Sequence, residues 1–111
     1  MKPTRFYSNR QEKSVAKAVS GKQTSNSGAT PFYKGDVTTD RFLIECKTCT
    51  SDKQSFSIKK DWIKKNQEEA FAVGKDYSAI AFNFGPDSEN YYVINENLFK
   101  ILKTYLEEGD K

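Results

Sequence analysis

The chain has 111 residues, with 18 Lys and Arg against 15 Asp and Glu, and it contains no histidine. This length suits a single domain over residues 1–111, which can bury a core without disulfide bonds. The missing histidine excludes Ser-His-Asp and Cys-His catalysis and most catalytic zinc sites. An enzyme of this composition is therefore left with carboxylates, lysine and hydroxyls, with or without a hard metal ion held by oxygen ligands.

Two features concern the environment of the protein. No apolar run approaches the roughly 20 residues that cross a bilayer, and the N-terminus lacks the apolar stretch of a signal peptide. We therefore expect a soluble, cytoplasmic protein with no membrane partner. Cys46 and Cys49 form a lone C-x-x-C, whereas a structural zinc site takes four ligands. Two reduced thiols are thus favoured over a zinc site.

The N-terminal part predicts a helix and then a loop. The helix is expected over residues 8–20, with Ser8 as N-cap, Gln11 completing a capping box and Gly21 ending it. Its expected inward stripe is Val15, Ala18 and Val19. Residues 22–31 are rich in Ser, Thr, Asn and Gly and are expected to form a loop.

Two strands are predicted next, joined by a turn. Residues 32–38 form the weaker strand, residues 39–40 the turn and residues 41–48 the stronger strand. The apolar run over residues 42–44 is continuous, which indicates a central strand covered on both faces.

The remainder of the chain predicts a second helix, two strands and a last helix. The second helix spans residues 58–73, and residues 77–84 and 91–94 form strands. The expected apolar stripe of that helix is Ile58, Trp62, Ile63, Ala70 and Phe71, with Gly74 ending it. Asn95 then caps the last helix, whose apolar residues are Leu98, Phe99, Ile101, Leu102, Tyr105 and Leu106, with Gly109 behind it. The predicted fold class is α/β, a mixed central β-sheet flanked by helices.

The chemistry-bearing feature is Glu45 with Lys47 at the end of the apolar strand. Residues two apart on a strand point to the same face, so the carboxylate and the ammonium lie side by side. About one E-x-K triplet is expected by chance in this composition, so the triplet alone proves nothing. A charge in a doubly covered strand, however, is costly unless it is paired or binds a metal. A structural salt bridge and a metal site are both consistent with Glu45 and Lys47 at this position.

Asp36 favours the metal site. It belongs to the neighbouring strand of the predicted hairpin, and an antiparallel pairing brings it near the level of Glu45 if the register allows. Two carboxylates at one level repel unless a divalent cation lies between them. Mg²⁺ suits such a site, because it takes few protein carboxylates together with waters and phosphate oxygens.

The pattern formed by Asp36, Glu45 and Lys47 resembles the motif of the PD-(D/E)xK nuclease superfamily, with Gly35 where the family usually has proline. The layout is most similar to the Holliday junction resolvase-like branch, which includes small phage-encoded nucleases. There a first-helix glutamate precedes a Ser/Gly loop and the D…ExK hairpin, and Glu12 and Ser27 match those features. The resemblance implies a restriction-endonuclease-like core and, for a phage protein, location in the host cytoplasm.

The resemblance also implies roles for individual residues. Asp36 and Glu45 would ligate Mg²⁺ (or Mn²⁺), with the backbone carbonyl of Cys46 a further ligand and Glu12 completing the site. Lys47 would position the attacking water. Gln67 matches a position that often carries a polar active-site residue, although a solvated glutamine fits it equally well.

The expected function is metal-dependent hydrolysis of DNA, selective for branched structures, and a junction resolvase also needs a homodimer for its two symmetric cuts. The residues expected to contact DNA are Ser27, Lys13, Lys17, Lys22, Lys53, Lys59, Lys60 and Lys64. Three alternatives remain: a monomeric nickase or flap-type nuclease, a non-catalytic DNA-binding module, and a purely structural or protein-binding domain. Tyr91, Tyr92, Phe99 and Tyr105 could form a dimer interface, but core packing is the simpler interpretation of most of them.

Overall fold

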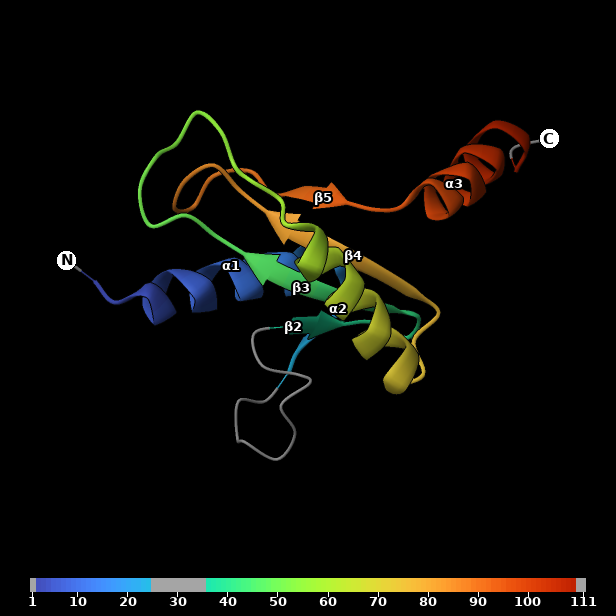
Figure 1. Cartoon of the computed structure of the whole chain (residues 1–111), viewed down its shortest axis with the longest axis horizontal. Coiled ribbons are helices and arrows are strands. Elements are labelled where there is room, and N and C mark those ends of the chain that lie inside the picture. Colours follow the sequence, from blue (N-terminus) through green and yellow to red (C-terminus); the bar gives the residue numbers. More distant parts are fainter. Residues whose placement is uncertain (1, 25–35, 110–111) are drawn as a thin grey trace.

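A computed structural model describes residues 2–24 and 36–109, and these form a mixed α/β structure (Figure 1). The elements in chain order are α1 (Thr4–Val19), β1 (Lys22–Gln23), β2 (Asp36–Thr38), β3 (Phe42–Lys47), α2 (Lys60–Ala72), β4 (Tyr77–Phe82), β5 (Tyr91–Val93) and α3 (Glu96–Glu108). The predicted α/β class with a mixed sheet is confirmed.

The sheet has five strands in the order β1-β2-β3-β4-β5, and only β3 and β4 among the paired strands run parallel. A parallel pair needs a crossover connection, and α2 provides it. The prediction of a loop from residue 22 is wrong at its start. Lys22 and Gln23 form strand β1, which pairs with Thr38 and Val37 of β2. A two-residue edge strand carries too little alternation to be recognised in the sequence.

The hairpin of β2 and β3 has the register on which the site depends. Asp36 lies opposite Glu45, and Val37 lies opposite Ile44. The turn is closed by the Thr39 amide, which donates to the carbonyl of Phe42 at 3.1 Å. Residues 32–35 of the expected strand, with Gly35, lie outside the described residues.

Strand β3 is covered on both faces, as its apolar run predicts, with α2 in front of the sheet and α1 behind it in Figure 1. Ile44 packs in one cluster with Val15 of α1. On the other face, the amide of Asn66 in α2 reaches the carbonyl of Leu43 at 3.5 Å. Successive residues of β3 therefore belong to opposite layers of the core.

Helix α1 differs from the prediction at its start and in its buried face. It begins at Thr4, preceded by Pro3, and the hydroxyl of Ser8 donates to the carbonyl of Thr4 instead of capping. Proline fixes φ and commonly precedes or opens a helix, which moves the start upstream. Ala18 is exposed, and the buried residues of the helix are Gln11, Glu12 and Val15. Two polar side chains thus occupy the inward face.

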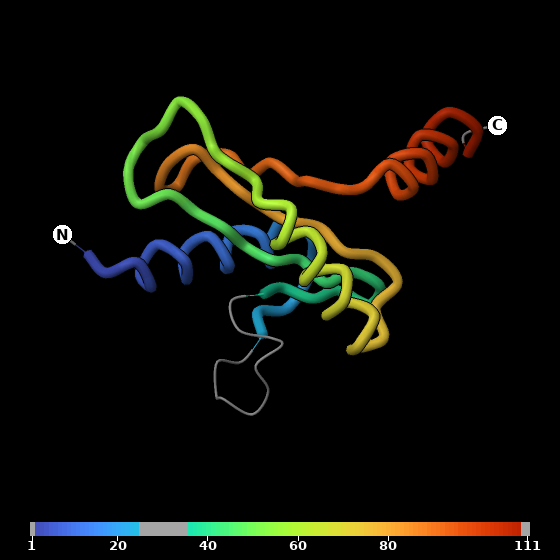
Figure 2. The backbone as a smooth tube through the Cα atoms, in the orientation of Figure 1, coloured from blue at the N-terminus to red at the C-terminus, as the bar shows by residue number. Residues whose placement is uncertain are grey.

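A long loop over residues 48–59 leads from β3 to α2 and arches over one end of the sheet (Figure 2). The amide of Lys53 donates to the carbonyl of Phe84 at 2.7 Å, which ties the loop to the segment that follows β4. The ring of Phe56 lies 5.1 Å from that of Phe82 and 6.2 Å from that of Trp62. These aromatic contacts fix the loop and the first turn of α2 against the sheet.

Helix α2 lies within the expected bounds and ends before Gly74, whose φ of +77° suits a glycine behind a helix. Its expected apolar stripe is wrong at Phe71, which is exposed, whereas Asn66 and Ala70 are buried. The helix is rotated so that a polar residue faces β3, and the sequence alone does not set this rotation.

Helix α3 begins behind Asn95, whose side chain accepts from the Leu98 amide at 2.9 Å, so the predicted cap is confirmed. The core-packing interpretation of the C-terminal aromatics is wrong, because Tyr91, Tyr92, Phe99 and Tyr105 are all exposed. Within the described ranges, no helix is long and apolar enough to cross a membrane.

Candidate functional site

Two carboxylates face each other on adjacent strands. Asp36 opens β2 directly opposite Glu45 of β3, and residues paired in this way point to the same face of the sheet. Their neighbours Val37 and Ile44 pack toward α1, so the two carboxylates point toward the layer of α2. Asp36 is only 2% exposed. The predicted meeting of Asp36 and Glu45 is therefore present in the fold.

Burial makes this pair unfavourable in its ionised form. The pKa of the Asp36 carboxyl is raised to about 8, and burial is the largest cause. Three neighbouring carboxylates raise that pKa further, and the ammonium of Lys47 opposes them; the carboxylates are Glu45, Glu69 and Glu12. At neutral pH the metal-free protein thus holds a proton on Asp36, which a bound cation would displace.

Lys47 lies at the same end of β3. Its ammonium is 3.3 Å from a carboxylate oxygen of Glu45 and 4.5 Å from the centre of the Trp62 ring. Both contacts are favourable, and together they restrict a long side chain that would otherwise sample many rotamers. The ammonium is therefore held beside the carboxylate pair.

Glu12 approaches from the other layer of the fold. It is 4% exposed on α1, and burial raises the pKa of its carboxyl, while a hydrogen bond with Gln23 and the charge of Arg5 lower it. Its charge also raises the pKa of Asp36. Glu12 is thus within electrostatic reach of the pair, from the side of the sheet opposite to α2.

Cys46 stands between Glu45 and Lys47 but points to the α1 face, where it packs against the core. Burial raises the pKa of its thiol, as do Glu12, Asp36 and Glu45, so the group stays protonated and unreactive. Neither Cys46 nor Cys49 forms a disulfide bond within the described residues. The role of the Cys46 carbonyl as a metal ligand stays a prediction.

On α2 the residue near the pair is Glu69 and not Gln67. Gln67 is exposed and lines a hollow with Tyr77 and Leu98. Burial and then the charge of Glu45 raise the pKa of Glu69. Residues two apart on a helix point to nearly opposite sides. The spacing from Trp62 to Asn66 and Glu69 repeats at about one helical turn, and that signal could have identified Glu69.

The basic residues expected to bind DNA are all exposed where the structure describes them, namely Lys13, Lys17, Lys22, Lys53, Lys59, Lys60 and Lys64. Lys59 lies 5.7 Å from the Trp62 ring, the same ring that Lys47 contacts. Lys59 and Lys47 therefore share one aromatic neighbour. Ser27 lies outside the described residues.

The donor set suits a hard divalent cation that takes few protein ligands. In residues 2–24 and 36–109, no group of three or more His, Cys, Asp or Glu is arranged to hold a metal ion. Two facing carboxylates, one buried with a raised pKa, are nevertheless what a cation would neutralise. Mg²⁺ fits this arrangement, because it keeps several waters and binds substrate phosphates in its remaining positions.

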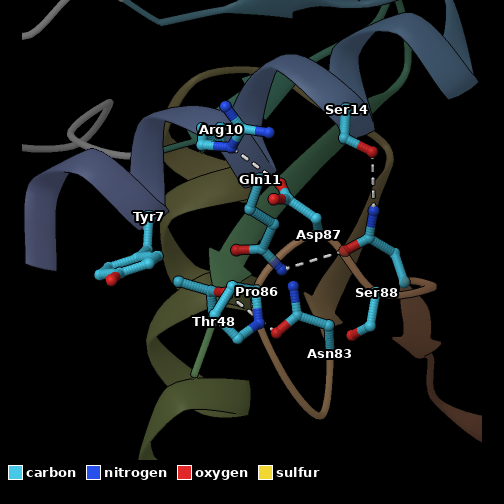
Figure 3. Close-up of a pocket in the computed structure, with 10 residues that line it drawn as sticks. Tyr7, Arg10, Gln11, Ser14, Thr48, Asn83, Pro86, Asp87 and Ser88 are labelled. Carbon is cyan, nitrogen blue, oxygen red and sulfur yellow. Dashed lines mark hydrogen bonds and ion pairs between the residues drawn. The ribbon is translucent and has the colours of Figure 1, made fainter. Parts of the chain in front are cut away.

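Gln11 ties α1 to the end of β3 beside the site. Its side-chain amide donates to the carbonyls of Lys47 and Ala81 at 2.7 and 3.3 Å and to Asn90 at 3.2 Å. The amide borders an open polar pocket of about 240 Å³ that Arg10, Thr48 and Asn83 also line (Figure 3). Because Glu12 follows directly in α1, this anchor holds the helical turn that carries Glu12 against the end of the sheet.

We expect Gln11→Leu to lower the free energy of unfolding by about 1–3 kcal/mol, because it leaves carbonyls near the end of the sheet without their donor. Urea denaturation followed by circular dichroism measures this change. Lys13→Leu introduces the same residue at an exposed position of the same helix and is expected to change stability little. Equal effects of the two variants would contradict an anchoring role for Gln11.

Comparison with known proteins adds no relative: no family model, no characterised protein and no solved structure matches the chain significantly.

Proposed function

We propose that the chain is a Mg²⁺-dependent DNA endonuclease whose site is built from Asp36, Glu45 and Lys47. The observation that supports this most is the pairing of Asp36 with Glu45 across the hairpin, with Lys47 at 3.3 Å from Glu45. A buried carboxyl with a raised pKa, facing a second carboxylate, is typical of functional sites more than of structural ones.

In this proposal Asp36 and Glu45 hold the metal, with Glu12 acting from the α1 side. A bound Mg²⁺ supplies charge neutralisation at the scissile phosphate. Lys47 donates hydrogen bonds to the attacking water and to the phosphate, and its contacts with Glu45 and Trp62 keep its ammonium in place for this. The resemblance stated above implies 5′-phosphate and 3′-hydroxyl products.

We also infer a restriction-endonuclease-like core of the PD-(D/E)xK superfamily. The order of elements supports this: a helix with a buried glutamate, an antiparallel hairpin with Asp36 and Glu45, and a crossover helix leading to a parallel strand. The substrate we propose is branched DNA, as in the Holliday junction resolvase-like branch. A chain of 111 residues has little surface for reading bases, which favours recognition of DNA shape.

The test is incubation of the full chain with four-way, flap, nicked and linear DNA in Mg²⁺ or Mn²⁺, with EDTA as the metal-free control. We expect scission of the four-way junction in either metal and none in EDTA. Lys47→Ala is expected to reduce the rate by about 100-fold, since a positioned charge at the phosphate is lost. Lys100→Ala, at an exposed lysine of α3 outside the expected DNA contacts, is the matched control and should cut at close to the normal rate.

Cleavage of flap or nicked DNA in preference to the junction would replace the resolvase by a monomeric nickase or flap-type nuclease of the same site. A second candidate is a non-catalytic DNA-binding module. The ion pair of Lys47 with Glu45 supports this alternative, because such a pair can also be purely structural. Salt-sensitive DNA binding without scission of any substrate in either metal would support that module.

A further inference from the structure

Helix α3 exposes an apolar face that nothing in the described parts of the chain covers. Only Leu98, in its first turn, is buried, and every residue from 99 to 109 is exposed. In Figure 1 the helix extends away from the sheet at the C-terminal end. A helix of 13 residues is marginal in water by itself, so its stability normally comes from packing its apolar face.

The apolar face forms one narrow stripe. Successive residues of a helix are rotated by about 100° around its axis. The residues of the stripe lie within roughly 60° of Leu102 around this axis, whereas the charged residues of α3 lie about 100° or more from it. The members are Leu98, Phe99, Leu102, Tyr105 and Leu106. Lys103 and Glu107 form an ion pair at 3.2 Å outside the stripe. The helix therefore presents one side to a partner and the other to water.

The stripe is symmetric along the helix. Leu98 and Leu106 are equally far from Leu102, and so are Phe99 and Tyr105. An antiparallel second helix of the same sequence, related by a two-fold axis at Leu102, places apolar residues opposite apolar residues throughout. A self-complementary patch of this kind is what a two-fold interface between identical chains requires.

We propose that α3 pairs antiparallel with α3 of a second copy of this chain, with Leu102 on the two-fold axis. The available area supports a dimer. Phe99 and Tyr105 of the stripe are 61% and 73% exposed, and an aromatic side chain buries about 150–250 Å². Two copies thus offer on the order of 400–700 Å² from these aromatic side chains. Leu102 and Leu106, 41% and 69% exposed, bring the interface toward the roughly 1,200 Å² at which stable complexes begin.

The charges of α3 argue against a membrane surface as the occupant. Its polar side carries Lys100 and Lys103 against Glu96, Glu107 and Glu108, whereas helices that lie on anionic lipid are rich in Lys and Arg on that side. The dimer does not depend on nuclease activity, although it would place two carboxylate sites in one symmetric particle.

Sedimentation equilibrium of the full chain without DNA or metal tests the proposal. We expect a dimer for the wild type and a dissociation constant at least about 100-fold weaker for Leu102→Lys, because a charge is placed at the centre of the interface. Thr104→Lys adds the same charge on the polar side of α3 and should leave the dissociation constant within about 3-fold. Circular dichroism checks that both variants keep the fold.

A cysteine cross-link tests the register. Leu102→Cys is expected to give a disulfide-linked dimer on mild oxidation, because the two-fold axis brings the two copies of this position together, whereas Thr104→Cys is not. A wild type that is monomeric at all concentrations would overturn the proposal, as would a dimer that Leu102→Lys leaves intact. Co-sedimentation of a monomer with phosphatidylglycerol vesicles would overturn it in favour of a lipid surface.

Discussion

Asp36→Asn is expected to abolish metal-dependent strand scission and, at the same time, to make the metal-free protein more stable above neutral pH. The substituted amide keeps the shape of the side chain but cannot carry the negative charge that holds a cation. We expect cleavage of the four-way junction at pH 8 in Mg²⁺ to fall by on the order of 1,000-fold or more. The cost of burying an ionised carboxylate and its repulsion with Glu45 both disappear, so the free energy of unfolding should rise by several kcal/mol.

The combination of these two effects distinguishes a functional from a structural carboxylate. Where a buried carboxylate only stabilises the fold, its removal lowers stability. Urea denaturation in EDTA and a gel-based cleavage assay on the same preparations measure both quantities. Asp40→Asn is the matched control, because Asp40 is an exposed aspartate in the turn of the same hairpin. A loss of stability in Asp36→Asn with cleavage unchanged would assign Asp36 to a structural ion network.

The second prediction concerns pH. The pKa of Asp36 is about 8 in the folded protein and about 4 in an unfolded chain. Between these values the folded state keeps a proton that the unfolded state has lost, so the contribution of Asp36 to stability is fully present at and below about pH 4 and decreases as pH rises. The loss is up to about 1.4 kcal/mol per pH unit from this residue, and it levels off above about pH 8.

The measurement is urea denaturation in EDTA from pH 5 to pH 9 on the wild type and Asp36→Asn. Glu12 and Glu69 also have raised pKa values, so the difference between the two proteins isolates Asp36. We expect this difference to increase with pH. When Mg²⁺ replaces EDTA, the difference in stability between the two proteins should become smaller. The decrease should be larger at pH 8.5 than at pH 6, because a cation stabilises only the ionised pair. A difference that does not vary with pH would show that Asp36 is already ionised at low pH.

The sequence by itself determined the hairpin and the residues that it brings together. Strand geometry repeats every two residues, so Glu45 and Lys47 share a face in any strand through them. A turn at residues 39–40 alone would place Asp36 opposite Leu43, whereas the observed turn, closed between Thr39 and Phe42, places it opposite Glu45. The shared face of Glu45 and Lys47 is thus a local relation that a short-range pattern specifies, and the pairing with Asp36 depends on the register.

Only the tertiary structure decided what each helix contributes. Glu69 rather than Gln67 is near the carboxylates, because the rotation of α2 depends on how Asn66 and Trp62 pack against the sheet. Gln11, which resembles a capping residue in sequence, instead anchors α1 to the end of β3. The amphipathic pattern of α3 shows that its apolar side must be buried but does not say against what. Such relations join residues far apart in the chain, and they depend on the packing of whole elements, which no local pattern encodes.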